Sequence, residues 1–475
     1  MSSFTERAGT ASEDCGVLPD TGLAALPETL ISFARFLADT PASAIPDAVM
    51  ERAADCVLDC LGAAAAGQDE PMVPEIAEEL CQIMGRGGAT IWFSGTGATK
   101  GTGASPIAAA TANALAATIL DVDDGHRKAK GHPGAAVIAS AFATAEDVGA
   151  SHRDFLAAVV MGYEAAVRVA LGRTAERQHD TASGLWSGIG AAVAASRLAG
   201  ASAERMAQAI LIAEQQAPQL ASAMRHGFAG SHVKEGIPWS VLTGTLAARL
   251  ARRGFTGYPQ TFDMADLYRP GALMEAGTAF GAIDGLYFKP YACCRWIHAA
   301  IDGVTSLLDD HRLDPGEIER IDILTFERAV GLENAVAPAT PVDAQFSIPF
   351  CVALAALRGR QALLPLRAAD LGDPAIIGLA RRIEPRFDPT MEALFPALAP
   401  AKVRLYHRGQ EYRARVDAAF GDPTNPMDRS DLRRKFEALA SGRIDAARIE
   451  ALIRTLSDFP GQATLGVRTT ISGYL

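Results

Sequence analysis

Residues 134–149 read GAAVIASAFATAEDVG, and residues 151–172 follow as SHRDFLAAVVMGYEAAVRVALG. Both stretches are helical in pattern, and both are rich in Ala. Ser151, followed three residues later by Asp154, is typical of a helix N-terminal cap. The two stretches therefore predict consecutive helices that pack closely through small side chains, in a mainly α protein.

The same helical pattern extends on both sides, over residues 26–270. Leu30, Phe33 and Leu37 share one apolar face, and Pro46 and Asp47 open a helix that ends at Gly67. Further helical stretches are expected at residues 105–120, 188–216 and 238–254. This half of the chain is predicted to be almost entirely α-helical.

The pattern changes after about residue 284. IERIDILTF (318–326) alternates as a strand does, and VRLYHRGQEYRARVDAAF (403–420) predicts a β-hairpin. FSIPFCVALAAL (346–357) and PAIIGLARRI (374–383) are helical in pattern. Helices return after Pro423, where Asp428 or Ser430 provides a cap. The expected domains are a tail at 1–24, a helical domain at 25–283, a smaller inserted α+β lid at 284–422, and helices at 423–475 that return to the first domain.

Composition excludes several classes of function. The chain has 475 residues, of which 49% are hydrophobic and 21% charged, which is enough to bury a large core. A net charge of −11 argues against a nucleic-acid partner. No run of about 20 apolar residues predicts a membrane span. The N-terminal residues resemble neither a secretory signal nor a transit peptide. The seven scattered cysteines are expected to be reduced thiols, with Cys293 and Cys294 a free pair, in a cytoplasmic protein.

The most informative stretch for chemistry is DVDDGHRKAKGHPG (121–134). Asp121 follows an apolar helix directly, which places it near the buried helix end. His132 stands at the start of the next helix, where free backbone N–H groups attract anions. An Asp that orients a His is a sensible acid–base arrangement, although a solvated loop is the alternative.

Two further stretches carry cations. Lys234 follows a Gly-rich loop, where a lone lysine is usually a surface residue. Arg225, His226 and His232 lie nearby and make an anion-binding loop the alternative. Lys289, Arg295 and His298 lie at the expected domain junction, where ligands tend to bind. A packed linker explains these three residues equally well.

Two other motifs are rejected. GTGATKGTG (95–103) fits neither the dinucleotide nor the P-loop pattern, and a turn between a short strand at ATIWF (89–93) and a helix is expected instead. The Asp residues of DVDDGH are crowded by His and Lys, and no second carboxylate cluster accompanies them. No metal is therefore expected at this stretch.

Taken together, nine stretches resemble the MmgE/PrpD family, which includes 2-methylcitrate dehydratase, cis-aconitate decarboxylase and iminodisuccinate epimerase. The matching pieces, in order, are VLDCLGAAAAG, LDVDD…GHPGA, GYEAAVR, AAVAASRLAG, GSHVK, ARRGFTGY, KPYACCRWIHAAID, AQFSIPF and KFEALA…RIEALI. The resemblance covers the chain after about residue 25. It implies a large all-helical domain with a smaller α+β lid, a homodimer, and no metal or organic cofactor.

The resemblance also assigns roles to residues. Asp121, His132, Lys234 and Lys289 fall on family active-site positions, with His132 as the leading acid–base group. The two lysines would hold substrate carboxylates or stabilise enolate-like charge. Arg225, Arg295 and His298 are the further candidates for substrate binding.

Several positions depart from the family pattern. The family often has Thr where Gly125 stands, a family His falls on Cys294, and a family Tyr falls on Phe350. His179 is the nearest counterpart of a further family His, about two residues too far upstream. The chain also has Gly236-Ile237 where the family has a Leu-His pair. An altered half-site therefore indicates a substrate different from those of the familiar members.

The leading hypothesis is a lyase that eliminates water, or a related group, from a small di- or tricarboxylic acid. Epimerisation or racemisation needs a second proton carrier, for which Cys294 is a candidate. Decarboxylation is a third variant of the same chemistry. The non-enzyme alternative is an inactive metabolite-binding protein.

Overall fold

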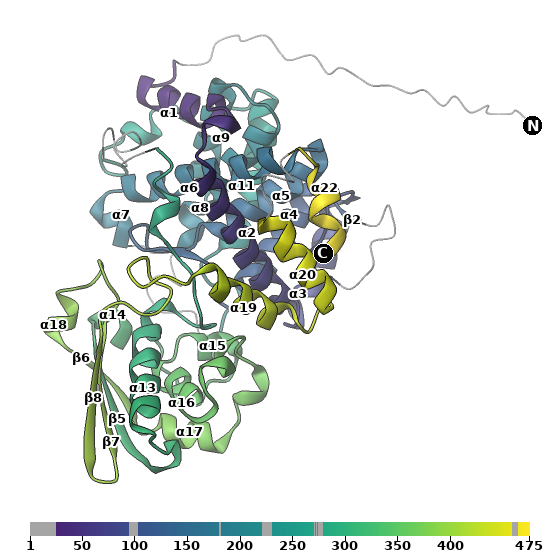
Figure 1. The fold of residues 1–475 in the computed structure, drawn as a ribbon. Helices are drawn as coiled ribbons and strands as arrows, with labels where there is room; N and C mark the ends of the chain where they lie inside the picture. The colour runs from purple at the N-terminus through teal and green to yellow at the C-terminus, as the bar shows by residue number, and fades with distance from the viewer. Residues whose placement is uncertain are drawn as a thin grey trace, which may run out of the picture.

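The computed structural model describes residues 25–94, 103–179, 182–220, 230–269, 271, 273, 279–457 and 464–475, without the side chains of residues 178 and 179. Figure 1 shows a larger helical part joined to a smaller part that contains a four-stranded sheet. The predicted tail at 1–24 and most of the rejected glycine-rich stretch lie outside the described residues. The mainly α fold class is confirmed.

The larger part is built mainly from helices. These helices are α1 (Glu28–Asp39), α2 (Asp47–Gly67), α3 (Met72–Met84), α4 (Pro106–Thr118), α5 (Gly134–Val148), α6 (His152–Gly172), α7 (Ala175–His179), α8 (Ser187–Leu198), α9 (Ala203–Gln215) and α11 (Ile237–Arg252). Ser151 caps α6 by accepting a hydrogen bond from the backbone N–H of Asp154, as predicted.

Small residues let these helices approach one another closely. Helix α8 packs against α5, α6 and α11 at the centre of the larger part. An added Cβ at Gly244 on α11 would overlap the carbonyl of Gly188 on α8, so the helix contact requires glycine there. The predicted small-residue packing is therefore present in the core.

Two expectations for this part were wrong. The stretch predicted as one helix at 188–216 is two helices, because Gly200 adopts a φ of 69° between α8 and α9. The strand expected at 89–93 does not form. Strand β1 is Arg86–Gly87, paired with β2 (Gly103–Ala104), and Ala89 makes only an isolated bridge to Ala104.

The smaller part contains a mixed sheet in the order β6-β5-β7-β8. Its strands are β5 (Ile318–Thr325), β6 (Ile383–Phe387), β7 (Ala401–His407) and β8 (Gln410–Val416). The predicted strand and hairpin are confirmed, with Arg408 and Gly409 at the turn. Strand β6 was missed: Ile383 ends the stretch that was assigned to a helix and pairs in parallel with Ile321 of β5.

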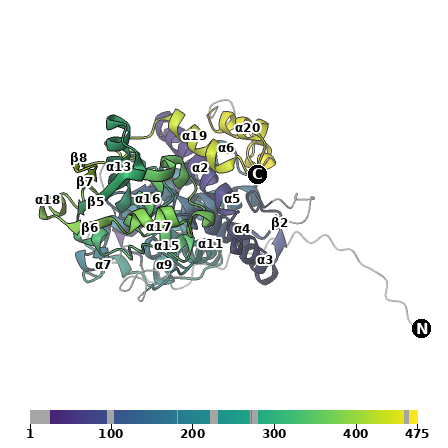
Figure 2. The same cartoon turned by 90° about the horizontal axis from the view of Figure 1, so that it is seen from below.

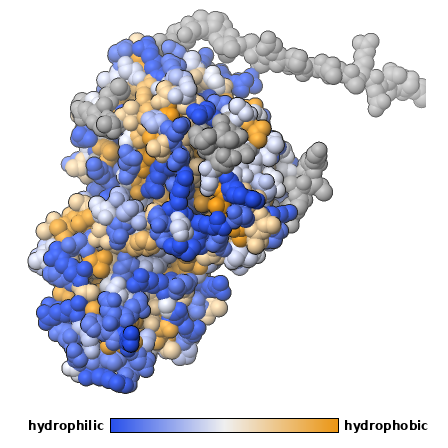
Figure 3. All heavy atoms as spheres, viewed as in Figure 1, coloured by the Kyte–Doolittle hydropathy of each residue, from blue (hydrophilic) through white to orange (hydrophobic). Residues whose placement is uncertain are grey.

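The helices of the smaller part lie against and beside this sheet. They are α13 (His298–His311), α14 (Glu327–Val330), α15 (Pro341–Gln345), α16 (Ile348–Arg358), α17 (Pro374–Ala380) and α18 (Pro389–Glu392). Helix α13 packs against both β7 and β8 and against α16. The outer end of this part is mainly hydrophilic in Figure 3, and Arg413 and Arg415 are exposed on the edge strand β8. Such charges discourage edge-to-edge pairing with another sheet.

The last long helices pack against the start of the chain. Helices α19 (Arg429–Ala440) and α20 (Ala446–Ser457) both contact α2, and Figures 1 and 2 show them beside it. They precede the short helix α22 (Val467–Thr470). Asp428 caps α19 in a capping box with Asp431, one of the two caps predicted.

A buried lysine fixes α19 in place. The ammonium of Lys435 donates hydrogen bonds to Oδ1 of Asp59 on α2, at 2.5 Å, and to the carbonyl of Val122, at 2.7 Å. The side chains of Lys435 and Asp59 are both buried. Helix α19 therefore supports the loop that follows α4.

One described helix, α6, is long and apolar enough by composition to cross a membrane. The protein buries 94% of its most apolar window, so packing in the helical core accounts for its character. The six described cysteines are free, as expected for reduced thiols; Cys15 lies outside the described residues.

Candidate active site

The loop between α4 and α5 carries the acidic cluster and is folded tightly. Helix α4 ends at Thr118, and Asp121 turns the chain with a φ of 54°. The two-residue strand β3 (Gly125–His126) then pairs with β4 (Leu286–Tyr287). The N–H of His126 donates to the carbonyl of Gly131, which closes the loop and returns the chain to His132. These contacts bring Asp121 and His132 together.

Asp121 is the centre of a buried charge cluster. Its Oδ2 lies 2.9 Å from Nζ of Lys289, and its Oδ1 lies 3.8 Å from Nζ of Lys234 and 3.9 Å from Nε2 of His132. Burial alone raises the pKa of the Asp121 carboxyl, but Lys289, Lys234 and His132 outweigh this, so its pKa lies below its ordinary value. Asp121 is therefore ionised at neutral pH.

The two ring nitrogens of His132 have different surroundings: one is hydrogen-bonded to a backbone carbonyl, and the other faces the charge cluster. Its Nδ1 lies 2.5 Å from the carbonyl oxygen of Asp124, and a carbonyl can only accept, so Nδ1 carries a proton. In the neutral ring, Nε2 then holds the lone pair that can take a proton. This nitrogen faces Asp121 at a distance that leaves it without a direct hydrogen bond there.

The surroundings of His132 favour its charged form. Burial lowers the pKa of His132, but the carboxylate of Asp123, followed by those of Glu235 and Asp121, outweighs burial and the opposing charge of Lys289. The net pKa lies above the ordinary value of 6.5. His132 therefore holds a proton more tightly than an ordinary histidine.

The expected anion site at the start of α5 is already filled by the protein. The N–H of Gly134 donates to Oδ1 of Asp124, at 3.1 Å, and the N–H of His132 donates to Oγ of Ser183, at 2.8 Å. Oδ2 of Asp124 accepts from the hydroxyl of Tyr163 at 2.5 Å. Burial raises the pKa of Asp124 to about 7. The start of α5 therefore holds the His132 loop in place through the N–H groups of His132 and Gly134.

Lys234 joins the two parts of the protein at the site. Its ammonium donates to the carbonyls of Thr118 and Ile119, at 2.8 and 3.3 Å, and to Oε1 of Gln345 on α15, at 3.0 Å. Nε2 of Gln345 donates to the carbonyl of Ile119 at 3.0 Å. Burial lowers the pKa of Lys234, and Asp121 offsets this only in part. Lys234 is thus a better proton donor than an ordinary lysine.

Lys289 behaves in the opposite way. Burial alone lowers its pKa, but the contact with Asp121 outweighs burial, and the net pKa lies above the ordinary value. Lys289 therefore provides a fixed positive charge, whereas Lys234 is the lysine suited to proton transfer.

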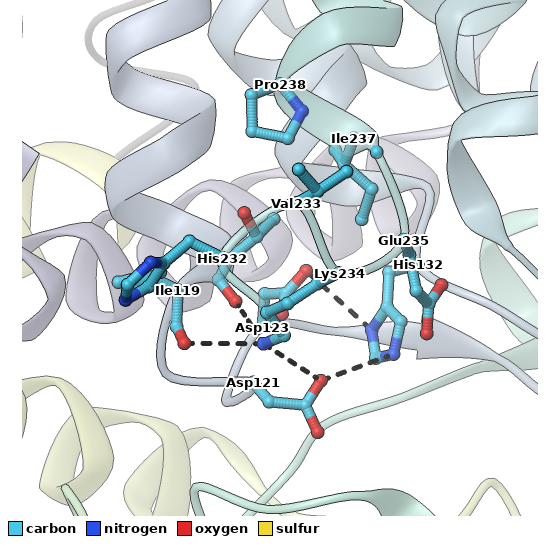
Figure 4. A pocket seen from close by; sticks show the side chains of 12 residues that line it. Ile119, Asp121, Asp123, His132, His232, Val233, Lys234, Glu235, Ile237 and Pro238 are labelled. Carbon is cyan, nitrogen blue, oxygen red and sulfur yellow. Dashed lines mark hydrogen bonds and ion pairs between the residues drawn. The ribbon is translucent and has the colours of Figure 1, made fainter. Parts of the chain in front are cut away.

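Figure 4 shows a pocket next to these groups, with Asp121, Asp123, His132 and Lys234 directed toward one another. The other lining residues are Thr118, Ile119, His232, Val233, Glu235, Gly236, Ile237 and Pro238. His232 and Val233 are exposed, whereas the acid–base groups are buried. The arrangement offers a proton acceptor, a proton donor and fixed charge beside one small cavity.

Other predicted residues have different surroundings. The guanidinium of Arg295 donates to the carbonyls of Phe420 and Ala419, at 2.9 and 3.0 Å, and also faces Nδ1 of His298. Because Nδ1 of His298 accepts there, its Nε2–H donates to the carbonyl of Cys293. Both side chains are buried and neither lines the pocket, which matches the packed-linker alternative.

Cys294 is half-buried and also does not line the pocket. Burial raises the pKa of its thiol well above the ordinary value, which disfavours the thiolate. Phe350 is buried on α16. Arg225 and the side chain of His179 lie outside the described residues, so they remain predictions.

Gly125 has a structural explanation. It pairs across β3 and β4 with Tyr287, and an added Cβ at Gly125 would overlap Cζ and the hydroxyl of that tyrosine. The guanidiniums of Arg127 and Arg295 also lie near the Tyr287 ring, 5.6 and 5.0 Å from its centroid. The departure at Gly125 is therefore matched by the ring at Tyr287.

Sequence reasoning did not single out Asp123, Gln345 or Tyr287 as site residues. Asp123 stood in the quoted acidic stretch, and Gln345 stood in AQFSIPF, so both were within matched segments. The contacts of Gln345 and Tyr287 join segments more than 100 residues apart, such as that between Lys234 and Gln345, whereas Asp123 contacts His132 within its own loop. Among the described residues, no group of three or more His, Cys, Asp or Glu side chains is placed to hold a metal ion.

Comparison with known families gives two matches. The MmgE/PrpD N-terminal domain matches residues 31–272, and the MmgE/PrpD C-terminal domain matches residues 291–458. The search of curated proteins found no match to the chain.

Proposed function

The chain belongs to the MmgE/PrpD family, which includes dehydratases and related enzymes, and from this premise we propose that it is a cofactor-independent lyase. It removes a proton next to a carboxylate of a small di- or tricarboxylic acid and expels water or a related group from the neighbouring carbon. The observation that carries the proposal is the orientation of His132: its Nδ1 is bonded to a carbonyl, while its Nε2 faces a buried charge cluster beside a pocket.

The groups at the pocket divide the chemistry between them. Nε2 of His132 takes the α-proton, and the electron pair left on the substrate carbon forms the new double bond. Lys234 delivers a proton to the leaving oxygen, which departs as water, because burial makes its ammonium more acidic than usual. Lys289 does not itself line the pocket; it keeps its charge and contributes positive charge to the site from behind Asp121, with which it is paired.

Lys234 must exchange a partner to do this. Its three ammonium protons already reach three acceptors, two backbone carbonyls and Gln345. Since Gln345 belongs to the smaller part of the protein, we infer that substrate binding replaces this contact and moves α15 relative to Lys234.

The alternatives have weaker support at this site. An epimerase needs a second proton carrier, and the thiol of Cys294 is held in its protonated form by burial and lies outside the pocket lining. An inactive binding protein would not need the proton acceptor and donor that stand beside the pocket. The expected dimer and cytoplasmic location remain predictions.

The test follows each of six acids (methylcitrate, citrate, cis-aconitate, malate, tartrate and iminodisuccinate) in D₂O by proton NMR. A lyase produces an alkene, or hydrates one. The His132→Gln variant should lose at least about 100-fold in rate, since a general base contributes 10²–10⁴-fold. Deuterium entering the α-position without a new product would indicate an epimerase instead of a lyase. A decarboxylated product would indicate a decarboxylase. If wild type and His132→Gln were equally inert on every acid, the lyase proposal would fail.

A further inference from the structure

Asp123 is a buried carboxylate at the pocket to which the chemistry above gives no role. It is 2% exposed, and its Oδ2 has no hydrogen-bond partner among the described residues. The same oxygen lies 3.7 Å from Nδ1 of His132, on the side of the ring opposite the proton-accepting Nε2. Figure 4 shows Asp123 directed at the imidazole.

The neighbouring carboxylates are already compensated. Asp124 accepts hydrogen bonds from Tyr163 and Gly134, and Asp59 is paired with Lys435. Asp121 has Lys289 at 2.9 Å and Lys234 at 3.8 Å. Asp123, in contrast, has one ion-pair partner within 4 Å among the described residues, and that partner is His132.

This difference has a consequence for His132. A buried carboxylate without hydrogen bonds is costly unless a positive charge compensates it. The two lysines neutralise much of the negative charge of Asp121. Asp121 therefore stabilises the positive form of the imidazole less strongly. Within the part of the chain that the structure describes, the His132 ring is the positively charged group within 4 Å of Asp123, and Lys289 and Lys234 act on Asp123 from farther away.

We propose that Asp123 is a positioning residue that stabilises the imidazolium form of His132 after His132 has accepted the substrate proton. This inference rests on the proposed role of His132 as the proton acceptor. The proton moves from the substrate carbon to Nε2, and Nδ1–H stays bonded to the carbonyl of Asp124. The positive charge that then spreads over the ring faces the Asp123 carboxylate.

Other charged groups also face His132 and must be separated from this effect. Asp121 lies on the same loop, Lys289 follows β4, and Glu235 precedes α11. Glu235 is held by the hydroxyl and the N–H of Ser183. Burial of His132 and the charge of Lys289 oppose imidazolium, while Asp123, Glu235 and Asp121 favour it.

The test is a pH titration of His132 by NMR in the ligand-free, full-length protein with labelled histidine, assigned by the signal lost in His132→Gln. In Asp123→Asn, which keeps the shape and removes the charge, the proton affinity of His132 should fall at least about tenfold, or one pKa unit. Asp123→Glu should restore part of it, and Asp310→Asn, at an exposed position on α13, should leave it unchanged. An unchanged His132 titration in folded Asp123→Asn would overturn the proposal.

Should Asp123→Asn not fold, the wild-type protein decides the question. With labelled aspartate, the Asp123 carboxyl and the His132 ring should respond to each other's titration, as expected for a coupled pair. Independent titration of the two groups would contradict the proposal. Because these measurements need no substrate, they separate this inference from the lyase proposal. Coupling without turnover on any acid would refute only the latter.

Discussion

Nζ of Lys289 lies 2.9 Å from Oδ2 of Asp121, and the lysine side chain has no exposed surface. This ion pair joins the loop after α4 to the segment that leads into the smaller part of the protein. Removing one partner leaves the other as an uncompensated buried charge, which typically costs about 3–5 kcal/mol.

We therefore expect Asp121→Asn to lower the free energy of unfolding by about 3–5 kcal/mol and to abolish turnover. Urea unfolding of this variant and of the exposed control Asp310→Asn measures the difference. The double variant Asp121→Asn/Lys289→Met should recover much of the stability but none of the activity. If the double variant were as unstable as the single one, packing rather than charge would explain the loss.

The stability of this pair should also depend on pH. The pKa of Asp121 is lower in the folded protein than in the unfolded chain. Its contribution is therefore complete above the unfolded value of about 4 and is lost as pH falls through the folded value. Unfolding curves recorded between about pH 6 and pH 3 should show the wild type losing more stability than Asp121→Asn/Lys289→Met.

The rate should follow a bell-shaped pH profile. Because the pKa of His132 lies above 6.5 and the base must be neutral, kcat/KM should rise with pH through a midpoint above 6.5. It should fall again as Lys234 loses its proton, at a midpoint below the ordinary lysine value of 10.5. A profile that instead falls as His132 is deprotonated would reverse the two roles and make His132 the acid.

Gln345 offers a separate test of the contact between the two parts. Gln345→Leu removes an acceptor from Lys234 and a donor from the carbonyl of Ile119, so we expect a loss of about 1–3 kcal/mol in stability. Gln345→Glu instead places a carboxylate beside Lys234 and should move the alkaline limb of the pH profile upward. Gln361→Leu, at an exposed position in the same part, is the matched control.

Gly125 and Tyr287 should behave as a coupled pair. Gly125→Thr places side-chain atoms in the space of the Tyr287 ring, and overpacking of this kind typically costs about 1–3 kcal/mol. The same substitution in a Tyr287→Ala background should cost less, because the space is then open. Thermal unfolding of the wild type, the two single variants and the double variant gives the coupling free energy between the two positions. Additive effects on stability would mean that the ring does not occupy that space.

Much of the helical part could be predicted from the sequence, because Ala-rich helices with clear caps such as Ser151 carry local signals. Gly200 was missed as a helix break because a single glycine within a helical pattern is tolerated elsewhere. Strand β6 was missed because its pairing with β5 joins residues about 60 positions apart, and only Ile383 of that strand lay in the quoted stretch.

The residues of the candidate site also fall into those that the sequence could predict and those that it could not. Asp121 and His132 could be predicted from their order in one loop, and the two lysines from the family resemblance. Whether a charged side chain faces the pocket or the interior depends on tertiary contacts. Arg and His side chains often bind carboxylates, so Arg295 and His298 were reasonable candidates. Their hydrogen bonds, however, all go to each other and to backbone carbonyls. Local pattern could not show that Lys289 pairs with Asp121 of the site whereas Arg295 and His298 do not.

The hydrogen bond from Lys435 to the carbonyl of Val122 spans 313 positions of the chain. Domains near the N-terminus generally fold first during synthesis. Here, however, the loop that holds Asp121 and Asp123 receives one of its supports only when α19 has left the ribosome. A nascent chain that already contains Asp121, His132, Lys234 and Lys289 therefore still lacks part of the frame for its site. The order of translation thus delays completion of this loop until the protein is almost fully made.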